Sequence, residues 1–346
     1  MLRSPGGIDD GSAGGATLVT RTFRADRGDA GSRLDHVLRR HLADLHGASR
    51  AKLQRWIDRG RVRVNGHPAS KPAARVAPGD EVAVAFPEPP ARTLRAQSIP
   101  VRVLYEDEHL LAVDKPAGLV VHPSFGHRDG TLMNALLWRA AAWGRDRRPS
   151  LVHRLDKHTS GVLLVAKSRT VHAGLVRAMA AGGAAKDYLA VVYGRVPTAH
   201  GRIALRLARD PLDRRRVIAV ATGGRESLTL YERVARSRGE RAGVALLRCR
   251  LMSGRLHQIR VHLAATGWPI VGDPVYGEPR WKALASADLA AAAREFPRQA
   301  LHAWRLQIEH PALGRTLEIV APLPDDMVGL LRRAGIDPPG TVADSS

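Results

Sequence analysis

The sequence predicts a mixed α+β fold in two domains, a small N-terminal α/β module followed by a larger domain in which strands dominate. The length of 346 residues is enough for two domains. Many short strand-like runs lie after residue 100 without a regular alternation of strand and helix, which argues against a doubly wound sheet. A proline-rich stretch at residues 87–99 predicts a linker between the two domains.

Both ends of the chain are expected to be disordered tails, at residues 1–20 and 337–346. The first of these is mainly Gly, Ser and Ala and has too few apolar residues to build a core. It contains the acidic residues Asp9 and Asp10 and no apolar stretch, so it does not have the pattern of a signal peptide.

Residues 31–86 predict the N-terminal module, which begins with two short helices. The first is indicated by apolar residues at helical spacing, namely Leu34, Val37, Leu38 and Leu42. Ser49 is predicted to cap the second helix. That helix carries the apolar residues Leu53, Trp56 and Ile57. Its basic residues are expected mainly on the exposed side, and they are Arg50, Lys52, Arg55 and Arg59.

A β unit follows the two helices of the module. Residues 62–64 alternate between apolar and polar and are followed by Asn65-Gly66, which together predict a hairpin. Pro78-Gly79-Asp80 predicts a turn into another alternating strand at residues 81–84.

The larger domain is expected at residues 100–336. Its predicted strands are residues 101–105, 110–113, 161–166, 188–192, 246–251, 301–308 and 317–320. Its predicted helices are residues 131–139, 171–179 and 257–265.

The charge of the chain predicts a polyanionic partner. The net charge is +21 and the pI is near 11.3, so nucleic acid is the first candidate and an acidic membrane surface the second. No run of 18 or more apolar residues is present, so no membrane-spanning helix is expected. The single cysteine, Cys249, alternates with Arg248 and Arg250 and is predicted on the buried face of a strand. It can form no disulfide within the chain and no cysteine-based zinc site, which is consistent with a reducing cytoplasm.

The most informative stretch is residues 153–161, which is followed by the apolar run 162–165. It places Asp156 between Arg154 and Lys157, in a turn before a buried strand. A carboxylate in that position is costly unless it is paired or used. By itself the pattern is compatible with a structural ion pair as well as with a catalytic carboxylate.

Three further stretches accompany it in order, at residues 115–123, 186–194 and 253–262, the last continued by residues 272–277. Together with residues 153–161 they resemble the RluA-type pseudouridine synthases over residues 33 to about 330. The module at residues 31–86 resembles the RNA-binding domain named after ribosomal protein S4. This resemblance implies a mixed, mainly antiparallel sheet with flanking helices and a central cleft, and no cofactor.

The resemblance also assigns roles to individual residues. Asp156 matches the essential aspartate that attacks the target uridine, either at the uracil ring or at the anomeric carbon. Arg260 matches the arginine that pairs with this aspartate, and Tyr188 matches the tyrosine that stacks on the base. Arg154 matches the residue that takes the place of the flipped-out nucleotide. Burial would raise the pKa of an aspartate and a nearby guanidinium opposes that rise, so the pairing is physically sensible.

Simpler interpretations exist for the supporting residues. Tyr188 lies in an alternating strand and is compatible with a core position, while Arg260 and His257 are compatible with a solvated helix face. Arg255 and His257, within the third stretch, are expected to bind RNA together with Arg154 and the basic residues of the second helix. No metal site is expected, because no common zinc spacing is found among the histidines, namely His153, His158, His257 and His262.

The sequence therefore favours an enzyme that converts uridine to pseudouridine in structured RNA, with large-subunit ribosomal RNA as the expected substrate. The alternatives are a non-catalytic RNA-binding or ribosome-assembly factor and a synthase that acts on transfer RNA. The expected partner is RNA, either free or on a ribosomal precursor particle. A cytoplasmic monomer without membrane contact is expected. The departure Ser253-Gly254-Arg255-Leu256 from the usual third motif bears on the choice of substrate and not on the chemistry.

Overall fold

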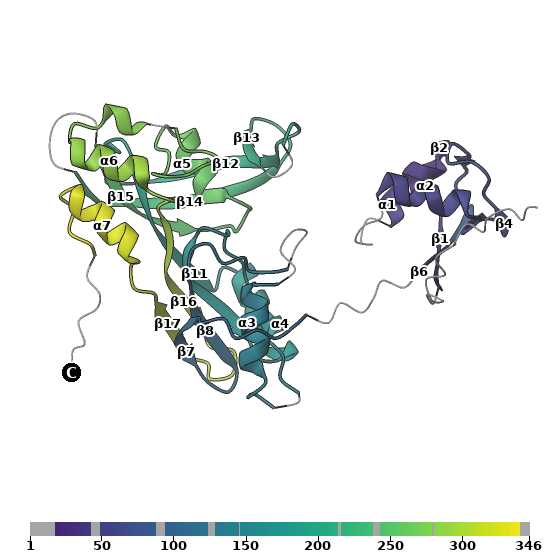
Figure 1. Cartoon of the computed structure of the whole chain (residues 1–346), viewed down its shortest axis with the longest axis horizontal. Coiled ribbons are helices and arrows are strands. Elements are labelled where there is room, and N and C mark those ends of the chain that lie inside the picture. Colours follow the sequence, from purple (N-terminus) through teal and green to yellow (C-terminus); the bar gives the residue numbers. More distant parts are fainter. Residues whose placement is uncertain are drawn as a thin grey trace, which may run out of the picture. The chain divides into compact units, whose positions relative to one another are not determined.

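The structure is a computed structural model that describes residues 18–42, 49–87, 94–123, 129–144, 146–213, 216–237, 243–278 and 280–339. The chain forms two compact units, Met1–Thr93 and Leu94–Ser346 (Figure 1). The first is a small α/β module and the second combines a large, mainly antiparallel sheet with helices. The predicted α+β fold class is thus confirmed.

The N-terminal unit packs two helices against small sheets. Its elements are β1 (Leu18–Arg24), a 3-10 turn η1 (Arg27–Asp29), β2 (Ser32–Arg33), α1 (Leu34–His41), α2 (Arg50–Asp58), β3 (Val62–Val64), β4 (His67–Pro68), β5 (Arg75–Val76) and β6 (Glu81–Pro87). Four strands form a sheet in the order β1-β6-β3-β4, and β2 pairs with β5. The apolar residues expected on both helices are buried in one core with strand residues such as Val62 and Val84.

The local signals in this unit are confirmed. The Ser49 hydroxyl accepts the backbone N–H of Lys52 at the start of α2. Arg50, Arg55 and Arg59 are exposed on α2 and Lys52 is half-buried. The Asn65-Gly66 turn joins β3 to β4, and both turn residues have the positive φ that this type of hairpin turn needs.

The predicted N-terminal boundary is wrong for residues 18–20. These belong to β1, which pairs antiparallel with β6 from Leu18 opposite Pro87 to Arg24 opposite Glu81. β1 is an edge strand with mostly exposed side chains, so it lacks the apolar alternation that marks a buried strand. Residues 1–17 and 340–346 of the predicted tails lie outside the described residues.

The predicted linker is also longer than the segment between the two units. Residues 94–99 belong to the second unit, where the Gln97 N–H donates to the Asn134 carbonyl and its side-chain oxygen accepts the Gly130 N–H. The Asn134 amide donates in turn to the Arg95 carbonyl. Residues 88–93 lie outside the described residues.

The second unit is built on an 11-stranded sheet. Its strands are β7 (Arg102–Glu106), β8 (Leu110–Lys115), β9 (Ser150–Leu151), β10 (Ser160–Ala166), β11 (Ala184–Tyr193), β12 (His200–Arg209), β13 (Val217–Val220), β14 (Arg225–Arg236), β15 (Val244–Leu251), β16 (Leu301–Glu309) and β17 (Thr316–Val320). The order is β13-β12-β14-β15-β11-β16-β10-β8-β7, with β17 beside β16 and β9 beside β10. All seven predicted strands are found.

Five α-helices of the described part accompany this sheet. They are α3 (Leu132–Ala140), α4 (Arg169–Ala180), α5 (Gln258–Ala265), α6 (Ala287–Glu295) and α7 (Asp325–Arg333), and a 3-10 turn η2 (Arg280–Ala283) precedes α6. In Figure 1, α3 and α4 lie at one end of the sheet, and α5, α6 and α7 lie at the other. The three predicted helices correspond to α3, α4 and α5, whereas α6 and α7 were not predicted. Cys249 is fully buried on β15, as expected.

A short parallel contact joins the two parts of the sheet. β10 and β16 pair through two positions only, Ser160 with His302 and Gly161 with Ala303, while every other pairing in this sheet is antiparallel. Gly161 has φ +110, and a β-carbon there would lie 2.1 Å from the Ala303 carbonyl oxygen. Only glycine fits this position. The joint lies directly after the turn that carries Asp156.

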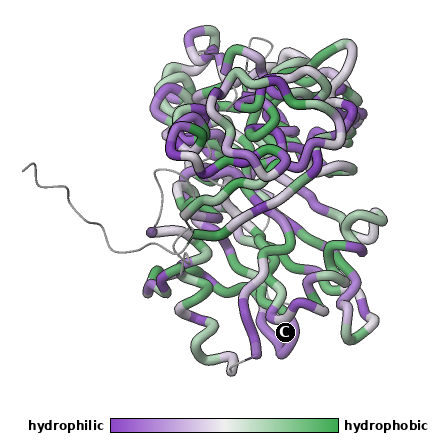
Figure 2. The backbone as a smooth tube through the Cα atoms, turned by 90° about the vertical axis from the view of Figure 1, so that its right-hand side faces the viewer, coloured by the Kyte–Doolittle hydropathy of each residue, from purple (hydrophilic) through white to green (hydrophobic). Residues whose placement is uncertain are grey.

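No helix in the described part of the chain is long and apolar enough to cross a membrane. Hydrophobic and hydrophilic stretches alternate over short distances along the backbone (Figure 2). This pattern is that of strands and helices with one buried face each.

We predict that Gly161→Ala destabilises the second unit by about 2–6 kcal/mol, because it combines a strained φ with a backbone clash. Scanning calorimetry of the full chain measures the change. Gly182→Ala is the matched control, because Gly182 also has a positive φ but has open space around it. The control should cost about 1 kcal/mol. Equal losses for both variants would contradict the close approach of β10 and β16.

Candidate active site

Asp156 lies in the turn that leads into β10. Its own carbonyl accepts the Thr159 N–H at 3.1 Å, which closes the turn. Leu155 and Thr159 are buried on either side, and this fixes the turn against the core. The Asp156 carboxylate remains 19% exposed and therefore faces a cavity while its backbone is held.

Two buried cations hold the backbone of this turn from beneath. The Lys115 ammonium donates to the carbonyls of Pro116, Leu119 and Lys157 at 2.8–3.0 Å. The Arg298 guanidinium donates to the His158 carbonyl at 3.2 Å and is paired with Asp326. Both side chains are almost completely buried. Positive charge therefore lies under the turn without blocking the carboxylate.

Three hydrogen bonds to carbonyl oxygens favour the charged form of Lys115, whereas burial favours the neutral form. Burial and the neighbouring Arg298 lower the pKa of Lys115 to about 7, while Asp156 and Asp114 act in the opposite direction. Three carbonyl acceptors require three N–H donors, which only the ammonium form has.

Arg260, on α5, joins two carboxylates. Its Nη1 donates to Asp156 Oδ2 at 2.9 Å, while Nε and Nη2 donate to both oxygens of Asp273 at 2.7 and 2.8 Å. The Arg260 side chain is only 5% exposed. Burial opposes its charge, but the hydrogen bonds and charges of the two aspartates hold the pKa of Arg260 above its usual value. A planar guanidinium fixes the carboxylates in a way that a lysine could not.

Asp273 is the fixed end of this arrangement. One of its oxygens also accepts the N–H groups of Val275 and Tyr276, at 2.9 and 3.1 Å. Burial opposes ionisation, but Arg260 and these N–H donors hold the pKa of Asp273 below its usual value. Asp273 is therefore a buried anion that orients Arg260 toward Asp156.

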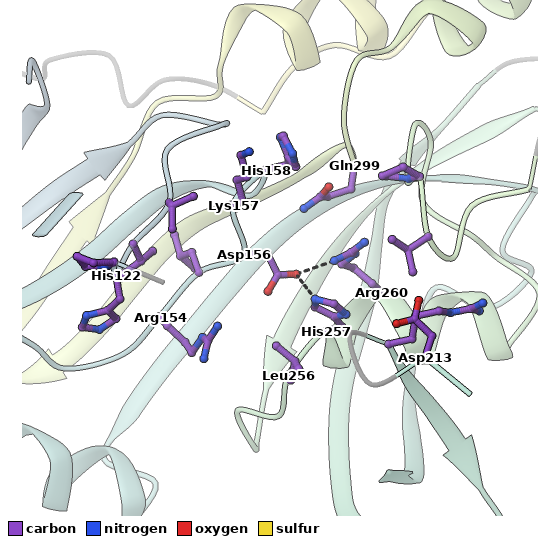
Figure 3. Close-up of a pocket in the computed structure, with 17 residues that line it drawn as sticks. His122, Arg154, Asp156, Lys157, His158, Asp213, Leu256, His257, Arg260 and Gln299 are labelled. Carbon is purple, nitrogen blue, oxygen red and sulfur yellow. Dashed lines mark hydrogen bonds and ion pairs between the residues drawn. The ribbon is translucent and has the colours of Figure 1, made fainter. Parts of the chain in front are cut away.

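His257 lies beside Asp156 (Figure 3), and its ring packs edge-on against that of Tyr276. His257 Nε2 lies 3.8 Å from Asp156 Oδ2, and its Nδ1 lies 2.9 Å from the Tyr276 hydroxyl. That hydroxyl accepts the Val217 N–H, so its own hydrogen is available to Nδ1. This pattern fits a neutral imidazole whose Nε2–H faces Asp156. Burial lowers the pKa of His257, against the charge of Asp156.

Tyr188 lies on β11 beside the Asp156 turn. Its ring is 7% exposed and lines a cavity together with Asp156 and Arg260. Burial, together with the charge of Asp156, raises the pKa of Tyr188 well above its usual value. The phenol is therefore neutral and presents an aromatic surface.

Asp156 stands between two adjoining cavities. One, of about 820 Å³, is lined on its outer side by His122, Asp213 and Arg216. The other, of about 500 Å³, is lined by Tyr188 and Lys186. Both cavities are lined by residues of the stretches 153–161 and 253–262, namely Arg154, Leu155, Asp156, Leu256, His257 and Arg260. Each cavity is within the size range that holds a small ligand or a nucleotide.

The predicted site residues are distributed over both units. Asp156, Arg260, Tyr188 and His257 come together, and the exposed Arg154 and Arg255 lie at the same cavity. The remaining predicted RNA-binding residues, Arg50, Lys52, Arg55 and Arg59, lie on α2 in the first unit. The view of Arg260 as a solvated helix residue is wrong, because α5 is buried almost along its whole length.

Three of the four histidines considered as metal ligands have separate side-chain partners, and that of His257 is Tyr276. His153 Nε2 accepts the Leu164 N–H, and burial together with the charge of Lys186 lowers the pKa of His153 to about 4. His262 bonds to Ser227 beneath α5. In the first unit, the ligand atoms of Asp26, Asp29 and His41 lie within 4.8 Å of one another, but Arg40 already pairs with both carboxylates.

Sequence reasoning missed the supporting residues. The sequence predicts no individual role in the site for Asp273, Tyr276, Lys115 or Arg298. Asp273 forms a turn, and it also binds Arg260. The signal that was available is the position of Asp273 within the third motif, close to Arg260 in the chain.

Comparison with known proteins agrees with this geometry. Residues 109–265 match the family model of RNA pseudouridylate synthase and residues 32–82 match the S4 domain. The chain is 41% identical over 302 residues to ribosomal large subunit pseudouridine synthase D of Pseudomonas aeruginosa, which covers 87% of this chain and 91% of that protein. It is 39% identical over 314 residues to the protein of the same name from Vibrio parahaemolyticus, covering 90% and 93% of the two chains.

A solved structure shares the fold of the second unit. Human RNA Pseudouridylate Synthase Domain Containing 4 aligns with a TM-score of 0.56 and 24% identity, over 69% of this chain and 95% of that one. The resemblance inferred from the four motifs and the N-terminal module is thus confirmed. The chain belongs to the RluA-type RNA pseudouridine synthases and carries an N-terminal S4 RNA-binding domain.

Proposed function

We propose that this protein isomerises one or more uridines of large-subunit ribosomal RNA to pseudouridine, with Asp156 as the nucleophile. The observation that carries the proposal is the Asp156–Arg260–Asp273 chain of hydrogen bonds at the junction of two cavities. The choice of RNA is supported by the names of the two bacterial relatives, together with the S4 domain. The substrate is free RNA or an assembling particle, and the protein acts as a cytoplasmic monomer.

The reaction needs no added atoms. The N1–C1′ bond breaks and its electron pair stays on the uracil, which then rotates and forms a C5–C1′ bond. A proton leaves C5 and a proton is added to N1, so substrate and product are isomers. Asp156 forms a transient bond either to C6 of the ring or to C1′. Both routes need an oriented carboxylate, and the hydrogen bond from Arg260 Nη1 orients that of Asp156.

The target base has to leave its stack before Asp156 can reach it. Extrusion costs a few kcal/mol, and stacking on an aromatic face returns roughly 1–3 kcal/mol. Tyr188 offers that face in the cavity of about 500 Å³. Arg154 is exposed at the same cavity and can fill the space that the base leaves.

We predict that Asp156→Asn abolishes pseudouridine formation and leaves RNA affinity within a few fold, because the variant removes the nucleophile and keeps the shape. Asp146→Asn, at an exposed position, is the matched control. Each variant is expressed in cells from which the native gene has been deleted. Pseudouridine is then mapped position by position in the RNA of these cells. If Asp156→Asn abolished a pseudouridine signal in transfer RNA and none in ribosomal RNA, the substrate would be transfer RNA and not the one proposed. Near-normal turnover of the variant would refute the mechanism.

We predict that Arg260→Lys lowers the single-turnover rate at saturating RNA by about 100-fold, since an ammonium cannot hold both aspartates in fixed geometry. The variant keeps the positive charge, so a loss of rate would show that the orientation of the two aspartates matters. Arg332→Lys, exposed on α7, serves as the control. A rate within threefold of wild type would mean that charge alone is needed.

We predict that replacing Arg50, Arg55 and Arg59 with Gln weakens RNA binding and lowers the slope of log Kd against log salt by about 2–3, one phosphate contact per residue. The rate at saturating RNA should stay unchanged, because the second unit is untouched. Titrations at several salt concentrations test this. An unchanged slope would show that α2 does not contact the RNA backbone.

A further inference from the structure

Lys186 is a half-buried cation that forms no ion pair with any residue in the described part of the chain. It lies two residues before Tyr188 on β11 and lines the same cavity of about 500 Å³. It has no hydrogen bond or ion pair with any described residue. A β-carbon at Gly254 would lie 3.9 Å from the Lys186 Nζ, so this loop is beside the ammonium, and His153 at the same cavity also feels its charge.

The other enclosed lysines of the second unit differ from Lys186. Lys115 donates to three carbonyls, and Lys167 pairs with Glu106 at 2.7 Å. Asp187, the acid next to Lys186 in the chain, is turned away and bound by two arginines. Burial lowers the pKa of Lys186. A partly desolvated ammonium that faces a cavity is therefore available for a ligand that carries negative charge.

We propose that the Lys186 ammonium is a further catalytic residue that binds a carbonyl oxygen of the flipped uracil and stabilises the negative charge that develops on the ring. This proposal rests on the proposed function. Both routes of attack create that charge. If Asp156 adds to C6, the electron pair of the C5–C6 bond moves toward O4. If Asp156 displaces uracil at C1′, the pair of the broken N1–C1′ bond spreads over O2 and O4.

The position of Lys186 favours the base over a phosphate. Two residues along a strand span about 7 Å, so a base that stacks on Tyr188 has its ring oxygens within reach of the long lysine side chain. Four arginines line this cavity, and one of them, Arg260, is buried and held by two aspartates. Arg154, Arg209 and Arg255 are exposed, and Arg154 and Arg255 suit the RNA backbone, which stays in solvent. Lys186 is more enclosed than these three arginines. Placing it next to the extruded base concentrates its charge where the reaction needs it.

The decisive experiment compares Lys186→Met, Lys186→Arg and the matched control Lys282→Met, which changes a lysine on η2 that lines neither cavity. We expect Lys186→Met to lower the single-turnover rate at saturating RNA by about 100-fold, a typical effect of removing one such donor. Lys186→Arg should restore a part of the rate. RNA affinity and its salt dependence should stay unchanged, as should the rate of the control.

Two further readouts separate chemistry from structure. On RNA with 5-fluorouridine at the target, the fluorine stabilises the uracil anion, so the loss of substrate nucleoside should depend less on Lys186 than it does with uridine. The unfolding temperature of Lys186→Met should be no lower than that of the wild type, because the substitution removes a partly desolvated charge.

The outcomes can be told apart. Absence of pseudouridine with the wild-type protein would refute the proposed function itself. An active wild type with a fully active Lys186→Met would refute only the role of Lys186. A weaker Kd and a salt slope reduced by about 0.7–0.9, with an unchanged rate at saturation, would assign Lys186 to a phosphate and overturn the inference.

Discussion

The shared guanidinium of Arg260 is the constraint on which the site depends. It lies between a buried carboxylate, Asp273, and a partly exposed one, Asp156. Buried ion pairs of this kind are weak sources of net stability, because desolvation offsets their attraction. Their value here is orientation. Asp273 cannot be left unpaired without a large cost, so Arg260 must stay in place, and Asp156 therefore has a fixed partner before RNA arrives.

The sheet supplies the second constraint, because it brings together residues that are far apart in the chain. The turn with Asp156 precedes β10, and Tyr188 lies on β11, two strands away across β16. A register shift between β11 and β16 occurs at Asp187/Tyr188, opposite the strand residue Ala303 that packs on Gly161. The same short joint thus sets the position of Asp156, the proposed nucleophile, and of the Tyr188 ring.

The local features of this protein could be predicted from sequence, but most of the pairings could not. The cap at Ser49 and the hairpin at Asn65-Gly66 depend on neighbours in the chain, and both were found. The helix α5 was found as well, yet the pattern of its residues could not show that Arg260 is buried. Asp273 reads as a turn residue because its contacts with Val275 and Tyr276 are local.

Two of the missed strands, β12 and β14, differ in how well the sequence marks them. β14 carries many charged residues on its exposed positions, which weakens its apolar alternation, whereas β12 does alternate, at Ile203, Leu205 and Leu207. They lie toward the β13 end of the sheet, where one face needs little apolar cover. The sequence also could not predict that Lys186 forms no ion pair with the described residues, because a lysine in an alternating strand normally indicates only a solvated face.

The cations behind the net charge of +21 therefore differ in environment and in role. Lys115 and Arg298 donate hydrogen bonds to backbone carbonyls inside the protein, and Arg260 is shared by two aspartates. None of these three can release a counterion when RNA binds. The exposed arginines and lysines can, and they account for the salt dependence of affinity. The net charge thus overstates the number of phosphate contacts, whereas the cations proposed to act on the reacting base are few and enclosed.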